Sequence, residues 1–320
     1  MSPRPRFDLI TVGRIGIDLY PEQIGVPLAA VTTFARSLGG SATNVAVAAA
    51  RLGAEAAVVT KVGADPFGEY ARGRLAELGV DPRWVGTHPW LRTPLAFCEI
   101  HPPDEFPLLF YREPTAPDLT LGPEDFELGA IGAAGTFWVT GTGLSAEPCR
   151  AATLAALEHR AGGPGRAATI LDLDYRPMFW RDRGGAAAAA KAARQALPWT
   201  TVAVGNLDEV EVAVGSREPR EAARRLRALG PELAVVKMGP AGVFASDGEQ
   251  EVEIGALEVP VLNGLGAGDA FGGALAVGLG RGLGLHRALE LANAAGALVA
   301  SRHACADAMP DEAELEAALA

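Results

Sequence analysis

The sequence predicts an α/β fold in which a mostly parallel sheet is covered by helices on both faces. Short apolar runs rich in β-formers alternate along the chain with longer segments of strong helix formers. Repeated strand and helix units of this kind build parallel sheets, because each crossover helix packs back onto the sheet. The 320 residues, 49% of them apolar and 21% charged, suffice for one large α/β domain or two smaller ones.

The first two thirds of the chain carry this alternation. A strand is predicted over residues 7–12, and a helix over 41–52, because Ser41 is a capping residue type and good helix formers follow it. The same pattern then repeats as far as residue 237. It predicts strands at 56–62, 136–140, 168–173, 201–204 and 233–237, and helices at 67–78, 147–161, 207–214 and 219–229.

Further helices are expected where alanine and glycine dominate. The segment RDRGGAAAAAKAARQAL, residues 181–197, is typical of a solvated helix because it combines alanines with charges. Residues 268–281 and 285–301 are expected to form two Gly- and Ala-rich helices with short connections. A last helix is predicted over 311–319.

Two stretches interrupt the alternation, at residues 14–36 and 91–114. Neither has a convincing helical pattern, and the second resembles two strands joined by a Pro-rich acidic turn. We interpret them as a small β-flap that projects from the main sheet. Strands this short are unstable alone, so the apolar positions Leu95, Phe97, Leu109 and Tyr111 predict pairing of two flaps in a homodimer.

Charge and cysteine content exclude several classes of protein. The net charge of −11 argues against a nucleic-acid or anionic-membrane surface, because such partners attract clustered positive charge. The three cysteines have no CxxC spacing, which argues against a disulfide framework or a zinc site. No apolar stretch is long enough to span a bilayer, and MSPRPRFDLI lacks the apolar run of a signal peptide. We therefore predict a cytoplasmic protein without nucleic-acid or membrane partners.

The most informative motif lies at residues 259–279, VPVLNGLGAGDAFGGALAVGL. An apolar, strand-like run precedes Gly266, Ala267, Gly268 and Asp269, and a helix of small residues follows. Free N–H groups at such a helix start converge and form an anion hole. Asp269 could accept the proton of a hydroxyl that attacks a phosphoryl group held there. The alternative is a glycine-rich turn whose aspartate only complements the helix dipole.

Two other classes of function compete with this hypothesis. Gly141, Gly143 and Ala146 match a GxGxxA pattern between a strand and a helix, and Asp172 ends the next strand, as in NAD-dependent oxidoreductases. The interval to Asp172 exceeds the usual spacing of about 20 residues. A sugar or nucleotide sensor without catalysis is the second alternative, since fold does not fix function. P-loop and protein-kinase motifs are absent from the sequence.

Several further motifs occur in the order found in one family. They are Gly39-Gly40-Ser41-Ala42-Thr43-Asn44, Gly63-Ala64-Asp65-Pro66-Phe67-Gly68, Asn206-Leu207-Asp208-Glu209 and Lys237-Met238-Gly239-Pro240-Ala241-Gly242. Together with the GAGD segment they resemble the PfkB, or ribokinase-like, family of sugar kinases over nearly the whole chain. The resemblance implies a ribokinase-like three-layer α/β/α sandwich. It also implies one kinase domain over residues 1–320, with the β-flap as a lid.

The resemblance also implies roles for individual residues. Asp269 would be the base beside Gly266, Ala267 and Gly268; Asp18, Gly39, Gly40 and Asn44 would bind the sugar; and Asn206, Glu209, Lys237, Gly239, Gly242 and Asn293 would bind the nucleotide. ATP would be the donor, with Mg²⁺ oriented through phosphates and water near Asn206 and Glu209 rather than by direct ligands. The residues alone leave other interpretations open: a turn aspartate at 18, a helix-terminal amide at 44, a helix cap at 206 and 209, and a surface amide at 293.

A narrower resemblance points to one branch of the family. The segments GRIGIDLY, LAFCEI, FYREPTAPDL, LDLDYRPMFW and SRHACADAMP are similar to the branch that phosphorylates 5-dehydro-2-deoxy-D-gluconate at its 6-hydroxyl in myo-inositol catabolism. A keto acid carries a carboxylate, which Arg112 or Arg176 could bind, with Asp174 beside it. Arg112 could instead pair with Glu113 or Asp118, and Asp174 with Arg176. Kinases of 2-keto-3-deoxygluconate, ribose or fructose are the alternatives within the family.

Three residues depart from the family pattern. Many relatives have Asp-Thr where this chain has Asn263 and Gly264, and that aspartate helps to shape a monovalent-cation site. Ala304 stands where a glycine is common in the related C-terminal segment. These departures leave potassium activation open.

Overall fold

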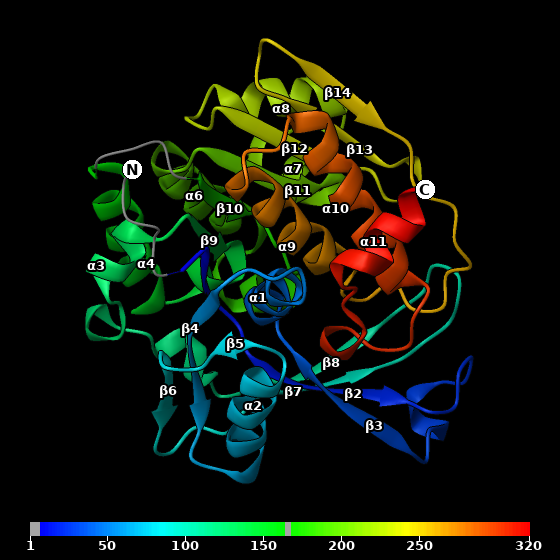
Figure 1. The fold of residues 1–320 in the computed structure, drawn as a ribbon. Coiled ribbons are helices and arrows are strands. Elements are labelled where there is room, and N and C mark those ends of the chain that lie inside the picture. Colours follow the sequence, from blue (N-terminus) through cyan, green and yellow to red (C-terminus); the bar gives the residue numbers. More distant parts are fainter. Residues whose placement is uncertain (1–6, 164–167) are drawn as a thin grey trace.

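The computed structural model describes residues 7–163 and 168–320. Figure 1 shows a large twisted sheet between two layers of helices, with a smaller sheet projecting beyond it. Residues 1–6, part of the segment that argues against a signal peptide, lie outside the described residues. None of the helices in the described part of the chain combines the length and hydropathy of a membrane span.

The large sheet has the strand order β14-β13-β12-β11-β10-β9-β1-β4-β5, and β6 pairs with β4. Its strands are β1 (Leu9–Val12), β4 (Ala56–Gly63), β5 (Val80–Asp81), β6 (Val85–His88), β9 (Thr136–Thr140), β10 (Ala168–Asp172), β11 (Val202–Asn206), β12 (Leu233–Lys237), β13 (Val243–Ser246) and β14 (Glu251–Ile254). All pairings are parallel except those of β13. The chain builds outward on one side of β1 and then on the other. A switch point therefore lies between β1 and β9, where ligands of open α/β sheets bind.

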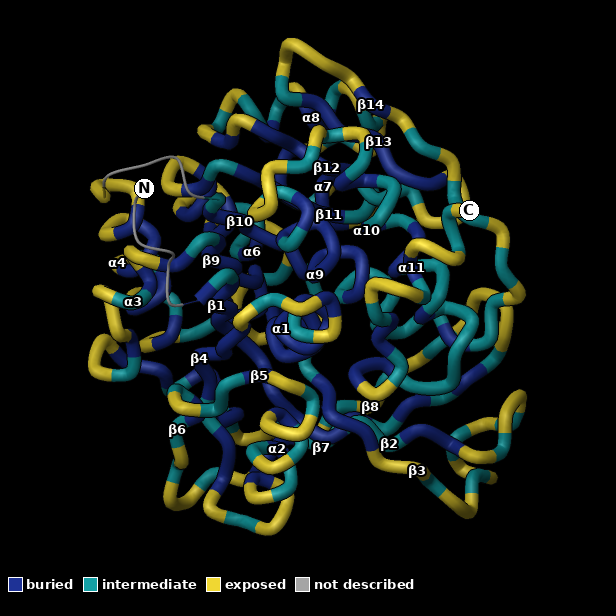
Figure 2. The backbone as a smooth tube through the Cα atoms, viewed as in Figure 1, coloured by how far each residue is buried: buried dark blue, intermediate teal, exposed yellow. Residues whose placement is uncertain are grey.

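Two apolar layers hold the helices against the sheet. One layer packs on α1 (Ser41–Arg51), α2 (Pro66–Glu77), α9 (Ala267–Gly280), α10 (Leu285–Ala300) and α11 (Glu312–Leu319). The other packs on α3 (Leu128–Ala133), α4 (Cys149–Ala161), α5 (Pro177–Trp180), α6 (Gly185–Ala196), α7 (Leu207–Val214) and α8 (Pro219–Arg227). Most strand residues are buried, as Figure 2 shows in dark blue. The three-layer α/β/α sandwich that the sequence predicts is confirmed.

The smaller sheet, called the flap sheet below, has the order β3-β2-β7-β8. It consists of β2 (Gly16–Pro21), β3 (Phe34–Gly39), β7 (Leu95–Cys98) and β8 (Leu108–Tyr111). Its strands come from the two stretches that interrupt the alternation, although β3 runs beyond residue 36. Tyr20, Cys98, Ile100 and Cys305 form a third apolar cluster. This cluster attaches the flap sheet to the C-terminal segment.

Three expectations about local structure are wrong. Residues 259–262 form no strand: the N–H groups of Leu262 and Asn263 donate to the carbonyl of Ala300, the last residue of α10, instead of pairing with a strand. The residue before α1 is Gly40 (φ 102°), so Ser41 is the first helical residue and not its cap. The segment 181–197 is not solvated all round, because Ala189, Ala192, Ala193 and Ala196 of α6 are buried against the sheet.

Candidate active site

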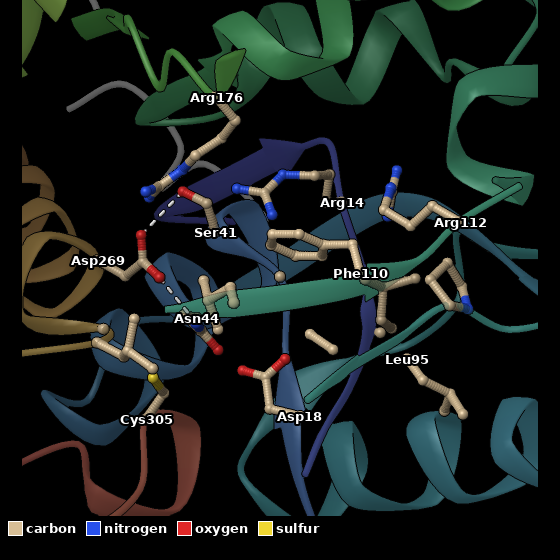
Figure 3. Close-up of a pocket in the computed structure, with 18 residues that line it drawn as sticks. Arg14, Asp18, Ser41, Asn44, Leu95, Phe110, Arg112, Arg176, Asp269 and Cys305 are labelled. Carbon is tan, nitrogen blue, oxygen red and sulfur yellow. Dashed lines mark hydrogen bonds between the residues drawn. The ribbon is translucent and has the colours of Figure 1, made fainter. Parts of the chain in front are cut away.

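A polar pocket lies at the carboxyl ends of the central strands, beside the flap sheet. Arg14 follows β1, Thr142 follows β9 and Asp174 follows β10, so all three lie at the switch point. The pocket opens to solvent. Figure 3 shows the polar and aromatic side chains that line it from α1, α9, the flap sheet and the loop after β10. They include Arg14, Asp18, Ser41, Asn44, Phe110, Arg112, Arg176 and Asp269.

Asp269 lies in the first turn of α9, where the first helical N–H groups have no partner within the helix. Its carboxylate accepts hydrogen bonds from Ser41 Oγ (2.8 Å) and Asn44 Nδ2 (2.7 Å), both on α1. Burial raises the pKa of Asp269 above its ordinary value, against the effect of these two donors. A raised pKa makes the carboxylate a better proton acceptor. The start of α9 thus combines anion-binding amides with a held carboxylate.

Glycines let the backbone approach closely around this carboxylate. Gly266 precedes α9 at φ 82°, and a Cβ there would overlap the Cys305 side chain. Gly40 precedes α1 at φ 102°, where a Cβ would overlap the Arg14 carbonyl group. Both turns are in the left-handed region that favours glycine. The predicted GAGD and GG motifs are therefore required by local geometry.

Asp18 and Asn44 face the pocket with unused hydrogen-bonding capacity. Asp18 is on β2, and Gly39 on the paired strand leaves no side chain that would overlap its carboxylate. Burial raises the pKa of Asp18 to about 7, with the positive charge of Arg14 opposing the effect. Within the described residues Asn44 Oδ1 has no hydrogen-bond partner, although it is buried. These oxygens can receive ligand hydroxyl groups.

Three arginines line the same pocket, and each is held by a buried acid. Arg14 Nη2 lies 2.9 Å from Asp174 Oδ2, and Arg176 Nε lies 3.1 Å from Asp174 Oδ1. Arg112 Nη2 lies 2.7 Å from Asp118 Oδ2. The pairings that the sequence left open are therefore present: Arg112 with Asp118, and Arg176 with Asp174. Each leaves other guanidinium N–H groups available to a ligand.

Asp174 is the centre of a charged network. Burial alone would raise its pKa, but the charges of Arg14 and Arg176 and a hydrogen bond from Thr142 (2.7 Å) lower it below its ordinary value. Asp174 has φ 30°, in the left-handed region that non-glycine residues rarely adopt. Arg14 and Arg112 also both lie over the Phe179 ring, at 5.4 and 5.1 Å from its centroid. The network thereby connects the flap sheet with the loop after β10.

The predicted nucleotide residues lie at the ends of β11 and β12, next to the start of α9. Asn206 caps α7: it accepts from the Glu209 N–H (2.9 Å), and Glu209 Oε2 accepts from the Asn206 N–H (2.7 Å). The helix-cap interpretation is therefore correct as local structure. Glu209 is nevertheless buried, unlike most capping acids. A cap alone gives no reason for that burial.

Lys237 connects the strand ends with α9. It lies opposite Asn206 in the sheet register, and its Nζ is 3.8 Å from Asp172 Oδ1. Burial raises the pKa of Asp172 to about 7, although Lys237 opposes it. A Cβ at Gly268 would lie 3.4 Å from the same Nζ, so the ammonium group is beside the helix start. It is placed where an anion bound at α9 would be neutralised.

Three further predicted positions lie at the margin of this region. Gly239 and Gly242, at φ 60° and 94°, form the turn after β12. A Cβ at Gly242 would overlap the Ile254 carbonyl oxygen, so the turn packs tightly against β14. Asn293 on α10 donates from Nδ2 to the Gly255 carbonyl oxygen (2.6 Å). None of these three residues lines the pocket around Asp269.

Four residues of the site are not predicted from the sequence: Arg14, Ser41, Phe110 and Thr142. Arg14 gives a signal that could have been used, because a charged residue directly after a buried strand marks the ligand-binding edge of an α/β sheet. Ser41 was interpreted only as a cap. Phe110 gave no such signal, because its orientation depends on the pairing of β7 with β8.

The dinucleotide alternative is not supported by the segment that suggested it. Residues 141–145 form a short 3-10 helix, and all five are buried. Thr142 in this segment already holds Arg14 Nε (2.9 Å). A Cβ at Gly141 would overlap the Leu173 carbonyl oxygen. Gly141 is therefore required for packing against the residue that follows β10, and this buried segment presents no glycine-rich helix start to a ligand.

The fold and the pocket together define a class of protein: an α/β enzyme with an anion-binding helix start, a held carboxylate and hydroxyl-binding groups in one pocket. Such a site suits phosphoryl transfer to a small polar alcohol. The profile described as "pfkB family carbohydrate kinase" matches residues 6–312. The chain belongs to this family, and it is an ATP-dependent sugar kinase.

Individual proteins show the same relationship. The chain is 32% identical to the 5-dehydro-2-deoxygluconokinase of Halalkalibacterium halodurans, over 99% of this chain and 96% of that protein. The crystal structure of a putative Ribokinase II from E. coli in complex with ATP and Mg²⁺ superposes with a TM-score of 0.87, at 23% identity, covering 98% of this chain and 99% of that one. A fructokinase double mutant from Vibrio cholerae O395, bound to fructose, ADP and potassium, gives a TM-score of 0.84 at 23% identity, covering 98% and 99%. The two structures show the shared fold.

Proposed function

We propose that this kinase transfers the γ-phosphoryl group of ATP to the 6-hydroxyl of 5-dehydro-2-deoxy-D-gluconate, within myo-inositol catabolism. One observation carries the proposal: a single pocket has Asp269 on one side and Arg112 on the other. Figure 3 places Asp269 and Arg112 on opposite sides of the pocket. A linear six-carbon acid has its carboxylate at one end and its primary hydroxyl at the other, which matches this arrangement. The similarity to 5-dehydro-2-deoxygluconokinases supports the same substrate.

Asp269 is the proposed base. Ser41 and Asn44 donate to its two oxygens and fix its orientation, so that a hydroxyl in the pocket meets a carboxylate already in place. The substrate hydroxyl gives its proton to Asp269 while its oxygen attacks phosphorus and the bond to the ADP leaving oxygen breaks. The amides of Gly266, Ala267 and Gly268 stabilise the charge on the transferring group.

The nucleotide phosphates would lie between α9 and the ends of β11 and β12. Lys237 would contact them, because its ammonium group is already beside Gly268. The turn at Gly239 and Gly242 and the amide of Asn293 would lie toward the base of the nucleotide. The E. coli neighbour bound to ATP and Mg²⁺ supports this donor.

The acidic oxygens of this region fit a magnesium ion held through water and phosphate. Glu209 is buried, and one of its oxygens is engaged by a backbone N–H. No group of three His, Cys, Asp or Glu side chains suited to a metal ion occurs in residues 7–163 and 168–320. Asn206 and Glu209 would therefore orient the hydrated ion. When bound, Mg²⁺ supplies neutralising charge for the phosphate oxygens.

The sugar hydroxyls would bind at the floor of the pocket. Asp18 offers two acceptor oxygens, and Asn44 Oδ1 has no protein partner among the described residues. The absence of side chains at Gly39 and Gly40 lets the substrate approach α1. Bound hydroxyls would satisfy the buried Asn44 oxygen, which otherwise carries a desolvation cost.

The substrate carboxylate would bind the arginines of the pocket. Arg112 is the first candidate, because it lies away from Asp269 and is oriented by Asp118 and Phe179. Arg176 is half-exposed and is attracted by the charge of Asp269, which contributes to raising its pKa. This position suits either the carboxylate or the phosphoryl group. A neutral sugar requires neither arginine.

A coupled ADP-release assay over inositol-pathway acids, 2-keto-3-deoxygluconate, fructose and ribose tests the proposal. Arg112→Leu and Arg176→Leu are expected to lower kcat/KM for the keto acid by about 10- to 150-fold and to leave the KM for ATP unchanged. Arg217→Leu, on the exposed surface, is the matched control. If the wild type prefers 2-keto-3-deoxygluconate, the protein is a 2-keto-3-deoxygluconate kinase instead. Preference for ribose or fructose, or no effect of either arginine variant, would overturn the acid substrate.

We also propose that the chain acts as one kinase domain whose flap sheet is a lid and a dimer contact. Leu109 and Tyr111 are 48% and 60% exposed, and Phe97 packs between Phe34 (5.3 Å) and Tyr111 (5.5 Å), which gives this face an aromatic surface. A second copy of the same face would cover it. Tyr111→Glu is expected to produce monomers in light scattering, whereas Trp199→Glu, on another surface, is not. A monomeric wild type would contradict the dimer.

The need for ATP and the three free cysteines support a cytoplasmic location.

A further inference from the structure

Asn263 joins two segments that form the wall of the anion hole. Its side chain is fully buried, in the loop that leads into α9. Asn263 Nδ2 donates to the His303 carbonyl oxygen (3.1 Å), and its Oδ1 accepts from the Leu265 N–H (3.0 Å). A carbonyl oxygen can only accept and an N–H can only donate, so these partners fix which end of the amide is which.

This amide connects directly to the start of α9. Leu265, whose N–H it holds, precedes Gly266, the residue before the helix. On the other side, Cys305 follows His303 by two residues and contacts Gly266 closely enough that a Cβ there would overlap its sulfur. Tyr20 of the flap sheet donates to the same sulfur (2.6 Å). The position of the amides at 266–268 therefore depends on the pairing of Asn263 with His303.

A monovalent cation does not fit these atoms. Potassium binds oxygen ligands, but Nδ2 of Asn263 presents a hydrogen to the His303 carbonyl that would otherwise be a ligand, and one lone pair of Oδ1 already accepts the Leu265 N–H. An aspartate at this position would be different, because its second oxygen would face the His303 carbonyl oxygen and a cation would be needed between them. The relative from Vibrio cholerae contains potassium, so the two proteins can be compared on this point.

We infer that the Asn263 amide takes the place of a monovalent cation in this kinase. It joins the loop before α9 to the segment around His303 by a neutral donor and acceptor pair. The enzyme therefore works at full rate without potassium, and Asn263 is a positioning residue for the anion hole. The inference rests on the proposed phosphoryl transfer at α9 only for its rate measurement.

The experiment compares the full-length wild type in potassium, sodium and choline chloride at equal ionic strength. The thermal unfolding midpoint and the kcat for ADP release are both expected to be the same in the three salts. The unfolding midpoint needs no sugar substrate, so an error in the proposed substrate cannot change it. A selective rise of either quantity in potassium would overturn the inference.

Asn263→Asp is the decisive variant. In choline it should unfold at a lower temperature and lose at least about fivefold in kcat, because two oxygens then face each other. Potassium should restore both quantities. Asn263→Ala loses the same hydrogen bonds without creating a cation ligand, so potassium should restore neither. Rescue of Asn263→Ala by potassium, or wild-type behaviour of Asn263→Asp in choline, would overturn the inference. Failure of Asn263→Asp to fold without potassium, with recovery in potassium, would support it.

Discussion

Two ends of the pocket region are built in different ways. At the proposed sugar end, side chains meet across long sequence separations: Asn44 and Asp269 are 225 residues apart, and Arg14 and Asp174 are 160 apart. At the proposed nucleotide end, Asn206 and Glu209 are three residues apart and satisfy each other within one helix cap. The contacts of Asp269 and Asp174 therefore depend on the whole fold, whereas the cap at Asn206 is formed by one strand and the helix after it. Substitutions at the sugar end should therefore lower kcat or stability more than substitutions at the nucleotide end.

The largest effect is expected for Asp269→Asn, which removes the proton acceptor at the sugar end and keeps its shape. We expect kcat to fall by about 10²- to 10⁴-fold, with little change in ATP affinity. Steady-state kinetics at saturating ATP, with ATP binding by calorimetry, measure both. Glu221→Gln removes an acid from the first turn of α8, outside the pocket, and should leave kcat unchanged. A near-normal kcat for Asp269→Asn would make Asp269 only a residue that complements the helix dipole.

The long-range charged network should matter most for stability. Arg14→Met removes the main partner of the buried Asp174, so the free energy of unfolding should fall by about 2 to 4 kcal/mol. Urea denaturation measures the change. The matched control is Arg217→Met, whose partners Asp208 and Glu211 are exposed, and it should have no measurable effect. Equal stability losses for the two variants would remove the distinction between the buried network and surface pairs.

The sugar end should also make stability depend on pH through Asp18. Its pKa in the folded protein is raised from 3.8 to about 7, so the folded state binds the proton more tightly than the unfolded state. The resulting stabilisation is complete below pH 3.8 and is lost as pH rises through 7. The free energy of unfolding of the wild type, relative to Asp18→Asn, should therefore fall by up to about 4 kcal/mol over this range. A difference that rises with pH would contradict the raised pKa.

The smallest effect is expected at the nucleotide end. Asn206→Ala removes a helix cap, which costs about 1 kcal/mol of stability, and should raise the KM for ATP without changing the KM for the sugar. Asp311→Ala is a matched control, because Asp311 and Glu314 form the same kind of capping box at the start of α11. It should cost similar stability and leave both KM values unchanged. If both variants raise the KM for ATP alike, the Asn206 effect is one of stability only.

The sequence predicted most elements of the fold and missed several short strands. The predicted helix and strand boundaries agree with the structure to within a few residues, because apolar periodicity and capping are local properties. The strands β13 and β14 were not predicted; both are short, and β14 is the edge strand of the sheet. The run at 259–262 has strand-like composition, but its N–H groups bond to the Ala300 carbonyl. Composition alone does not contain that partner.

The residues of the site also divide into those that local motifs predict and those that depend on the order of the strands. The glycines before α1 and α9, the carboxylate of Asp269 and the cap at Asn206 were all predicted from local motifs, because helix starts impose residue types at fixed offsets. Arg14 and Phe110 were not found, and the partner of Arg112 was left open. Those outcomes depend on which strands neighbour β1 and β7.

The sequence by itself therefore determined the α/β class and the family, and it predicted the residues of the proposed anion hole, since these follow from periodicity and from motifs a few residues long. Only the tertiary structure decided that Ser41 and Asn44 hold Asp269, that Asp174 joins Arg14 to Arg176, and that Asn263 reaches His303. The physical reason is distance along the chain. A hydrogen bond between residues far apart in sequence exists only once the sheet order and the helix packing bring their elements together.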